Sequence, residues 1–368
     1  MNAVDVSIRG RGPVAYALAL ALSRQGLSVA LEGEPPAPRS DDVRAYALNG
    51  AARGLLQGLR VWDALAATAV TPVQAMQGCG DAPGGAIHFE AGVLQMPALA
   101  WIVDAAELDS VLRTAARFAP HLRDGPTPGR AALTVLAEGK DSRSRDELGV
   151  PFHRRDYQQT ALATRLLADV PHDGRARQWF RSPDVLALLP MDRPVPGRSL
   201  ALVWSLPTPR AHELQQLPDA EFERELALAC GAAEGGLKLV APRCVWPLAL
   251  GRADRLCGPG WVLVGDAAHQ VHPLAGQGLN LGLADVATLA RVLAEREPWR
   301  GLGDAGLLHR YVRERAAATQ TMAGLTDTLL HLFAASPPWI RELRNRGLTL
   351  LDHLAPLKRV LAARAYDD

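Results

Sequence analysis

The segment 260–285, GWVLVGDAAHQVHPLAGQGLNLGLAD, restricts the possible folds of this chain more than any other part of its sequence. Its apolar start, WVLV, is typical of a buried parallel strand, and Gly265 lets the chain turn directly after it. The loop 272–278 is too rich in glycine and proline for regular structure, so a helix is predicted to begin near Leu279. Because the first-turn N–H groups of a helix attract negative charge, this loop is a place to hold an electron-rich ligand.

Asp266 is the acid at the end of that strand. Ligands of open α/β sheets bind at the carboxyl ends of the strands, which predicts that Asp266 faces a ligand. The alternative interpretation is an ordinary strand-to-helix turn without a ligand. It does not account for a long loop with three glycines that ends in Asn280.

The N-terminus predicts a βαβ dinucleotide-binding unit, with an apolar strand at 5–9, a helix at 13–24 and a second strand at 28–31. The pattern Gly-x-Gly-x-x-Ala lies between the first strand and the helix. Such a pattern alone is a weak signal, and its place between strand and helix makes it a strong one.

Each residue of this pattern has a physical role in a dinucleotide-binding unit. Gly10 makes the turn, Gly12 lets the backbone approach a pyrophosphate, and Ala15 permits close packing of the helix on the strand. Glu32 follows 22 residues after Gly10, where its carboxylate can accept hydrogen bonds from an adenosine ribose.

Two polar segments and a group of apolar runs lie between these two ends. The segment 42–49, DVRAYALN, can be interpreted as an exposed helix start capped by Asp42, and the segment 137–145, AEGKDSRSR, as a charged loop. Four runs predict strands of a half-buried antiparallel sheet, at 157–161, 175–180, 186–190 and 201–205.

Taken in order, these segments resemble the FAD-dependent aromatic hydroxylases, in the branch of the ubiquinone-biosynthesis hydroxylases. The run 265–285 is similar to their second flavin motif without interruption, and 42–49 resembles their D-x-R-x-x-A-L element. The segment 137–145 resembles their middle motif, A-D-G-x-x-S-x-x-R, with Glu138 in place of the usual Asp. The added methylene puts the role of that side chain in doubt. The resemblance implies an α/β protein of p-hydroxybenzoate hydroxylase-like fold: a Rossmann-type FAD-binding domain with an inserted mixed-sheet substrate domain and C-terminal helices.

The resemblance also implies roles for individual residues. Asp266 would bind a ribityl hydroxyl of FAD, and the loop with Pro273 would lie against the isoalloxazine ring. The helix start at Leu279 would stabilise negative charge on the reduced ring. Arg44 and Pro273 are the residues expected beside the reacting part of the flavin. The full expected cofactor-binding set is Gly10, Gly12, Ala15, Glu32, Arg44, Glu138, Gly265, Asp266, Pro273, Gly276, Gly278, Leu279 and Asn280.

The implied activity is hydroxylation of an aromatic ring, through reduced flavin and a C4a-hydroperoxide, on a polyprenylated phenol of ubiquinone biosynthesis. NAD(P)H would reduce the FAD and bind transiently, since the chain shows no second Gly-rich unit. Two alternatives stay open. One is a soluble hydroxylase of another aromatic metabolite. The other is a flavin-bound assembly subunit of a ubiquinone-biosynthesis complex without turnover, which the substitution at Glu138 and a shortened segment before it would suit.

Composition argues against several other classes of protein. The formal net charge of +1, without a basic stripe, predicts no nucleic-acid partner. The four cysteines lack metal-ligand spacing, and His269 and His272 have no evident third ligand, so no metal is expected. The N-terminus predicts neither a signal peptide nor a transit sequence, which favours a cytoplasmic protein.

The predicted domain organisation is discontinuous. We expect an FAD domain at 1–72, 99–150 and 245–322, a substrate domain at 73–98 and 151–244, and a C-terminal helical segment at 323–368. The 17 residues between Pro120 and Glu138 leave little room for the small strand meander of the family. The part 121–130 should therefore be mostly loop, and 131–136 should supply the strand before the middle motif.

The C-terminal segment has a pattern of its own. Between Trp339 and Arg364, apolar residues recur at helical spacing. The same stretch contains six basic residues and only two acidic ones. Such a helix can lie peripherally at a membrane interface, or it can pack over the FAD domain.

Overall fold

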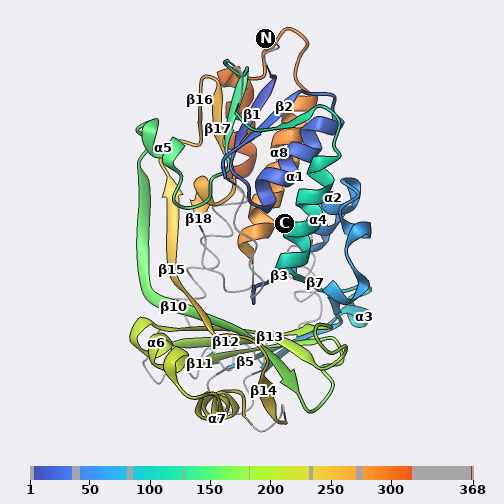
Figure 1. Cartoon of the computed structure of the whole chain (residues 1–368), viewed down its shortest axis with the longest axis vertical. Coiled ribbons are helices and arrows are strands. Elements are labelled where there is room, and N and C mark those ends of the chain that lie inside the picture. The colour runs from blue at the N-terminus through green and yellow to red at the C-terminus, as the bar shows by residue number, and fades with distance from the viewer. Residues whose placement is uncertain are drawn as a thin grey trace.

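The computed structural model describes residues 4–34, 42–80, 86–126, 129–181, 183–231, 235–270, 277–316 and 366. Three sheets organise this part of the chain. Figure 1 shows a helix-covered sheet at the top and a large curved sheet at the bottom, connected along one side by two long strands, β10 and β15.

The upper sheet has six strands in the order β16-β17-β9-β1-β2-β8, and all neighbours except β16 and β17 pair in parallel. These strands are β1 (Val6–Arg9), β2 (Val29–Glu32), β8 (Leu122–Asp124), β9 (Leu133–Leu136), β16 (Cys257–Gly258) and β17 (Trp261–Leu263). Side chains of β1, β9 and β17 form one buried apolar core with those of helices α1 (Pro13–Arg24), α4 (Ala105–Arg117) and α8 (Gln277–Ala294). Residues 305–316 are also helical.

A small antiparallel sheet lies between the upper and lower sheets. It consists of β3 (Ala45–Leu48), β7 (Ala100–Asp104) and β4 (Val70–Val73), with β7 in the middle. Helix α2 (Gly50–Gly58) follows β3 directly and is capped by Asn49, whose side chain accepts a hydrogen bond of 2.8 Å from the Ala52 N–H. Short helical turns follow at Trp62–Ala64 and Ala67–Ala69, and further on come α3 (Ala91–Leu94), α5 (Arg143–Glu147) and the turn Gly265–Ala267.

The lower sheet is mixed. Its order is β18-β15-β10-β13-β12-β11-β5-β6, with β14 also paired to β10. The strands are β5 (Ala75–Cys79), β6 (Ala86–Glu90), β10 (Phe152–Ala168), β11 (Arg175–Arg181), β12 (Asp184–Met191), β13 (Ser199–Pro207), β14 (Leu237–Leu239), β15 (Cys244–Ala253) and β18 (His269–Gln270). Helices α6 (Thr208–Gln216) and α7 (Asp219–Cys230) cover its outer face with an apolar core of their own (Figure 1). The opposite face of the sheet is turned toward the small sheet.

The α/β fold expected from the sequence is confirmed. The predicted βαβ unit forms β1, α1 and β2, and the four predicted antiparallel strands are β10 to β13. The interpretation of 42–49 as a helix start is wrong, because Ala45–Leu48 is a strand and the Asp42 carboxylate binds Arg44 instead of capping a helix. The expectation that 121–130 is mostly loop is confirmed for its described residues. A short strand, β8, forms within it because the open edge of β2 offers backbone hydrogen-bond partners.

Two expectations concern parts that the structure does not test. The division into domains stays a prediction. The C-terminal segment 323–368 lies outside the described residues except Tyr366, whose ring lies 6.0 Å from that of Trp101.

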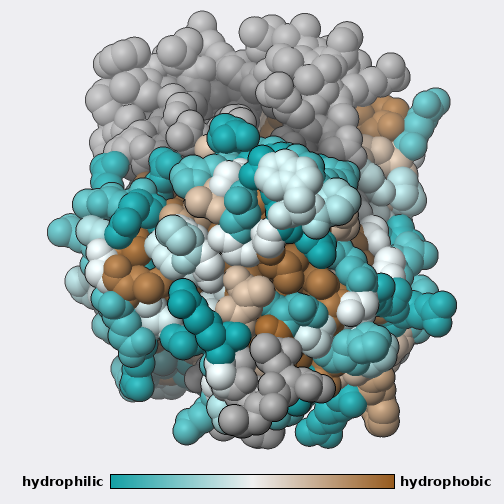
Figure 2. All heavy atoms as spheres, turned by 90° about the horizontal axis from the view of Figure 1, so that it is seen from above, coloured by the Kyte–Doolittle hydropathy of each residue, from teal (hydrophilic) through white to brown (hydrophobic). Residues whose placement is uncertain are grey.

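The described residues at the upper end of the molecule present a mostly polar surface (Figure 2). Figure 2 shows the upper end of the molecule, where hydrophilic side chains predominate and apolar ones form small separate patches. Scattered exposure of this kind is ordinary for a protein surface. Among the helices that the structure describes, none is long and apolar enough to cross a membrane.

Candidate active site

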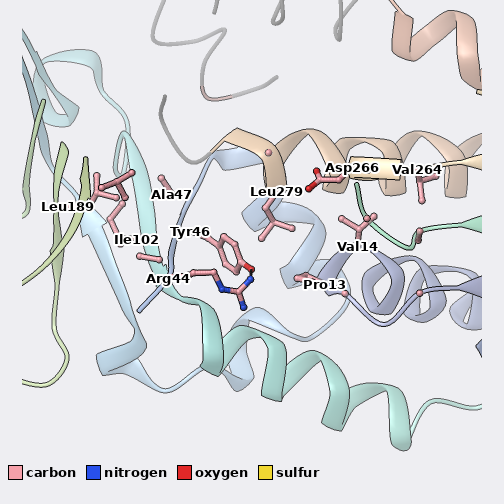
Figure 3. Close-up of a pocket in the computed structure, with 18 of the residues that line it drawn as sticks. Pro13, Val14, Arg44, Tyr46, Ala47, Ile102, Leu189, Val264, Asp266 and Leu279 are labelled. Atoms are coloured by element: carbon pink, nitrogen blue, oxygen red, sulfur yellow. Dashed lines mark hydrogen bonds between the residues drawn. The ribbon is translucent and has the colours of Figure 1, made fainter. Parts of the chain in front are cut away.

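A cavity of about 1110 Å³ lies between the upper sheet and the inner face of the lower sheet. Figure 3 shows that the two ends of the cavity have different linings. Pro13, Val14 and Asp266 lie at one end, and Ile102 and Leu189 at the other (Figure 3). Arg44 and Tyr46 lie between the two ends (Figure 3). One end is therefore formed by strand-to-helix turns with polar backbone, and the other by apolar side chains.

Three neighbouring parallel strands bring the polar end together. The strands β17, β9 and β1 are adjacent, and their last residues, Leu263, Leu136 and Arg9, are paired in register. The residues that follow these strands therefore lie side by side, although more than 100 residues separate each from the next in the sequence. Gly10, Glu138 and Asp266 all line the cavity at this edge.

The first turn has a glycine where a side chain could not fit. Gly10 has a φ of +129°, and a Cβ there would lie 2.2 Å from the carbonyl oxygen of Ala137. Close approach of β1 to β9 therefore requires this glycine. Gly12 differs, because a Cβ on it would meet no atom within 4 Å and would project into open space at the cavity wall.

Helix α1 begins directly after this turn. Gly12 is its N-cap without a side-chain hydrogen bond, and Pro13 occupies its first position. The free first-turn N–H groups and the helix dipole favour an anionic group here. Glu32 lies beside the turn at the end of β2, where its Oε1 accepts a 2.8 Å hydrogen bond from Ser7 Oγ.

The start of α8 is the second helix start at the cavity, and it lies in the glycine-rich segment 260–285. Gly265, Asp266, Gly278 and Leu279 line the cavity. Asp266 is an exposed residue and lines the cavity, so a ligand there can reach its carboxylate. Loss of water contact among the surrounding protein atoms raises the pKa of Asp266, while the charges of His269 and Lys140 oppose this rise.

A buried charged network holds the base of this turn. Asp285 is fully buried, and its Oδ2 accepts hydrogen bonds of 2.8 Å from the Gly265 N–H and from Nε2 of His269. Its Oδ1 accepts one of 2.7 Å from Nε of Arg315. Burial alone would raise the pKa of Asp285, but His269 and Arg315 outweigh it and lower that pKa. Burial would likewise lower the pKa of His269, and Asp285 raises it instead. We name Asp285, His269 and Arg315 the Asp285 network.

Arg44 is held in one geometry by two acids. Its Nε lies 2.8 Å from Asp42 Oδ1 and its terminal nitrogen 2.6 Å from Asp42 Oδ2, which is a bidentate pair. Asp109 of α4 lies 3.4 Å from the same guanidinium, and a third nitrogen lies 3.2 Å from the Tyr46 hydroxyl. Hydrogen bonding to Asp42 raises the pKa of Arg44, so it stays charged at the centre of the cavity. Burial raises the pKa of Tyr46, which keeps its hydroxyl protonated.

Glu138 organises the loop of the middle motif. Its carboxylate accepts hydrogen bonds from Ser142 Oγ at 2.5 Å and from the N–H and Oγ of Ser144, both at 3.0 Å. Ser142 in turn caps α5. Arg145 is buried under this loop, with its guanidinium carbon 4.1 Å from the centre of the Phe152 ring. The longer side chain at 138 therefore reaches three donors, and these hydrogen bonds connect it to the loop.

The other expected residues have different positions. Ala15 is fully buried beneath the first turn and contacts the core. Asn280 does not line the cavity: its side chain donates to the Ala47 carbonyl at 2.8 Å and accepts from the Asn49 N–H at 3.2 Å, joining α8 to the small sheet. Pro273 and Gly276 lie outside the described residues.

The residues that line the cavity suit the binding of FAD. Gly12 and Gly278 line it, and a Cβ at either position would meet no protein atom within 4 Å, so both leave space that a ligand can fill. The start of α1 suits a pyrophosphate, and Glu32 and Asp266 are acceptors for hydroxyl groups at two separate places. Among the residues that the structure describes, no cluster of His, Cys, Asp or Glu could hold a metal ion.

Several residues of this site could not be identified from the sequence. Asp109 and Tyr46 showed no local signal of their roles. Asp285 does have a local signal, because it is the single acid within the apolar helix sequence LNLGLADVATLA. A buried acid requires a partner. Neither His269 nor Arg315 could be assigned as that partner from spacing alone.

We expect Asp266→Ala to weaken FAD binding about ten- to hundredfold, because a hydrogen bond to a charged group contributes about 1.5 to 3 kcal/mol. Titration of the apoprotein with FAD, followed by flavin fluorescence, measures this. Asp63→Ala is the matched control, as Asp63 is an exposed acid outside the cavity. An unchanged affinity in Asp266→Ala would show that this carboxylate does not contact the flavin.

Comparison with known sequences also relates this chain to FAD-binding proteins. The family described as "FAD binding domain" matches residues 92–326, more than half of the chain. The ubiquinone hydroxylase UbiL of Rhodospirillum rubrum is 31% identical, with 98% of this chain and 89% of the relative covered. The 3-demethoxyubiquinol 3-hydroxylase of Escherichia coli is 30% identical over 96% of both chains.

Solved structures share the fold at lower identity. The p-nitrophenol 4-monooxygenase PnpA of Pseudomonas putida has a TM-score of 0.76 at 18% identity, covering 99% of this chain and 98% of its own. PqsL of Pseudomonas aeruginosa in complex with 2-aminobenzoylacetate has a TM-score of 0.75 at 22% identity, covering 94% and 99%. The chain therefore belongs to the FAD binding domain family and is an FAD-dependent aromatic monooxygenase related to the ubiquinone hydroxylases.

Proposed function

We propose that this protein hydroxylates the ring of a polyprenylated phenol in ubiquinone biosynthesis, with NAD(P)H as the electron donor. The observation that carries the proposal is the continuity of the cavity, from the polar strand ends to the apolar face of the lower sheet. A flavin held at the polar end would have space for an aromatic ring with an apolar tail beside it. The relatives named for ubiquinone hydroxylation support this substrate class.

The chemistry supplied with FAD is activation of molecular oxygen and transfer of one oxygen atom to an electron-rich ring. The chain itself binds, orients and excludes water. The α1 start and Glu32 would hold the adenosine diphosphate part, and Asp266 would hold the ribityl chain. The charge of Arg44 is fixed by Asp42 and Asp109, so it can stabilise negative charge on a neighbouring ring without moving.

The apolar wall has a second function in this reaction. Ile102, Leu189 and their neighbours leave few polar groups that could retain water near the substrate ring. Exclusion of water by this wall would suppress side reactions with solvent and so favour oxygen transfer to the substrate. Membrane contact and membership of a biosynthetic complex stay proposals that rest on the sequence of the C-terminal segment and on the relatives.

We expect NADH or NADPH to bleach the bound flavin under anaerobic conditions, and to do so faster when a prenylated phenol is present. Subsequent exposure to oxygen-18 should place the label in a new ring hydroxyl. Stopped-flow absorbance and mass spectrometry measure the two steps. A flavin that stays oxidised with both donors would contradict the proposal and favour a subunit without turnover. Reduction followed by labelling of an unprenylated phenol alone would favour a hydroxylase of another aromatic metabolite.

A further inference from the structure

The cavity-facing side of the lower sheet is arranged in rows, because its strands are in register. Gln178 of β11 pairs with Ala187 of β12 on one side and with Gly78 of β5 on the other. Ala187 pairs in turn with Val203, and Gly78 with Ile87. All five residues line the cavity. The amide of Gln178 is thus the polar centre of a row that is otherwise apolar.

The positions two residues before and two residues after Gln178 on β11 are apolar, whereas Arg177, directly before it, is charged and also lines the cavity. Side chains alternate between the two faces of a strand, so Ala176 and Phe180 share the cavity face with Gln178. Ala176 lies in a row with Met76, and this row packs against Ala47 and Ile102 of the small sheet. Figure 3 shows Ala47 and Ile102 on that side of the cavity, next to Leu189. The row of Gln178 is therefore the next one beyond this contact.

The two direct neighbours of Gln178 across the sheet have small side chains or none. Ala187 is half-buried, and Gly78 has apolar atoms over it, since a Cβ there would lie 3.1 Å from Ile87 Cγ2 and 3.7 Å from Phe180 Cε2. Neither neighbour is long enough to cover the amide from the adjacent strand. An amide has two donor hydrogens and an acceptor oxygen, so a partner within the protein and a ligand can bind it together.

We propose that Gln178 is a specificity-determining residue, whose amide hydrogen-bonds the ring oxygen of the phenol while the prenyl chain lies along the apolar rows beside it. This inference rests on the proposed function for the substrate class. Recognition of a hydroxyl by a polar group in an apolar wall discriminates strongly, because the analogue without the hydroxyl cannot replace that hydrogen bond among apolar neighbours.

The test is a binding experiment on the FAD-loaded enzyme with two ligands: a phenol with a short prenyl chain and the same molecule without its hydroxyl group. Binding is followed by the change in flavin absorbance. For Gln178→Leu we expect the phenol to bind about ten- to hundredfold more weakly, with the deoxy analogue changed less than about threefold. Gln178→Met, which keeps the length of the side chain, should show the same selectivity and guards against misfolding of the first variant.

Gln159→Leu is the matched control, since Gln159 lies on β10 of the same sheet, outside the cavity. It should bind both ligands as the wild type does. Ser205 of β13 is another polar residue of the cavity lining. Equal loss for both ligands in Gln178→Leu, no loss for either, or a selective loss in Ser205→Ala instead would overturn the inference. A wild type that binds the phenol selectively but forms no labelled product would overturn the proposed function and leave the role of Gln178 standing. A wild type that binds neither ligand would overturn both.

Discussion

Replacement of Asp285 by Ala is expected to lower the free energy of unfolding by about 3 to 5 kcal/mol, because it leaves buried cations without their partner. Arg315 and His269 are both nearly inaccessible to solvent and both bind this carboxylate. Urea unfolding of the apoprotein measures the loss directly. Arg291→Ala is the control: Arg291 pairs with Glu295 and Glu314 near the surface, and an exposed pair contributes at most about 1 kcal/mol. A loss below about 1 kcal/mol in Asp285→Ala would show that the network is not stabilising.

The same network predicts a pH dependence of stability. The pKa of Asp285 is lowered on folding, so its contribution is present above the unfolded value, about 4, and is lost as the pH falls through the folded value. The pKa of His269 is raised, so its contribution is complete below about 6.5 and is lost as the pH rises through the folded value. The wild type should therefore gain most from the network between about pH 4 and 6.5. The stability difference between wild type and Asp285→Ala, measured across pH, should be largest in that window.

The two glycines of the first turn are expected to respond differently to the same added methyl group. Gly10→Ala should lower the free energy of unfolding by about 2 to 6 kcal/mol, as the sum of backbone strain and overpacking. The physical reason is the 2.2 Å approach of the new Cβ to the Ala137 carbonyl oxygen, which belongs to the backbone of a neighbouring strand and cannot rotate away. Gly12→Ala should change stability by less than about 0.5 kcal/mol, because its Cβ meets no protein atom.

Gly12→Ala, which should hardly change stability, is expected to weaken FAD binding. The Cβ of Gly12→Ala would occupy the space of the pyrophosphate at the α1 start, so we expect a loss of affinity of at least about tenfold in a protein that folds normally. Urea unfolding together with FAD titration of the apoprotein separates the two effects. A Gly12→Ala variant with wild-type FAD affinity would place the pyrophosphate elsewhere, and a stable Gly10→Ala variant would contradict the close strand packing.

Local sequence was sufficient to predict the elements that carry the site. The strand, turn and helix around Gly10, the strand before Asp266 and the start of α8 were all predictable, because apolar periodicity and glycine act over a few neighbouring residues. The family followed from the same segments. The strand β8 was not expected, since its formation depends on the free edge of β2, which is not its neighbour in the sequence.

Only the tertiary structure decided which side chains meet. The order of β17, β9 and β1 brings Asp266, Glu138 and Gly10 to one edge, and no local pattern specifies strand order. The partners of Asp285 come from two separate segments, and Asp109 reaches Arg44 from a helix 65 residues further along the chain. Such contacts depend on packing between elements, whereas the sequence by itself determines mainly the elements, the turns that need glycine and the family.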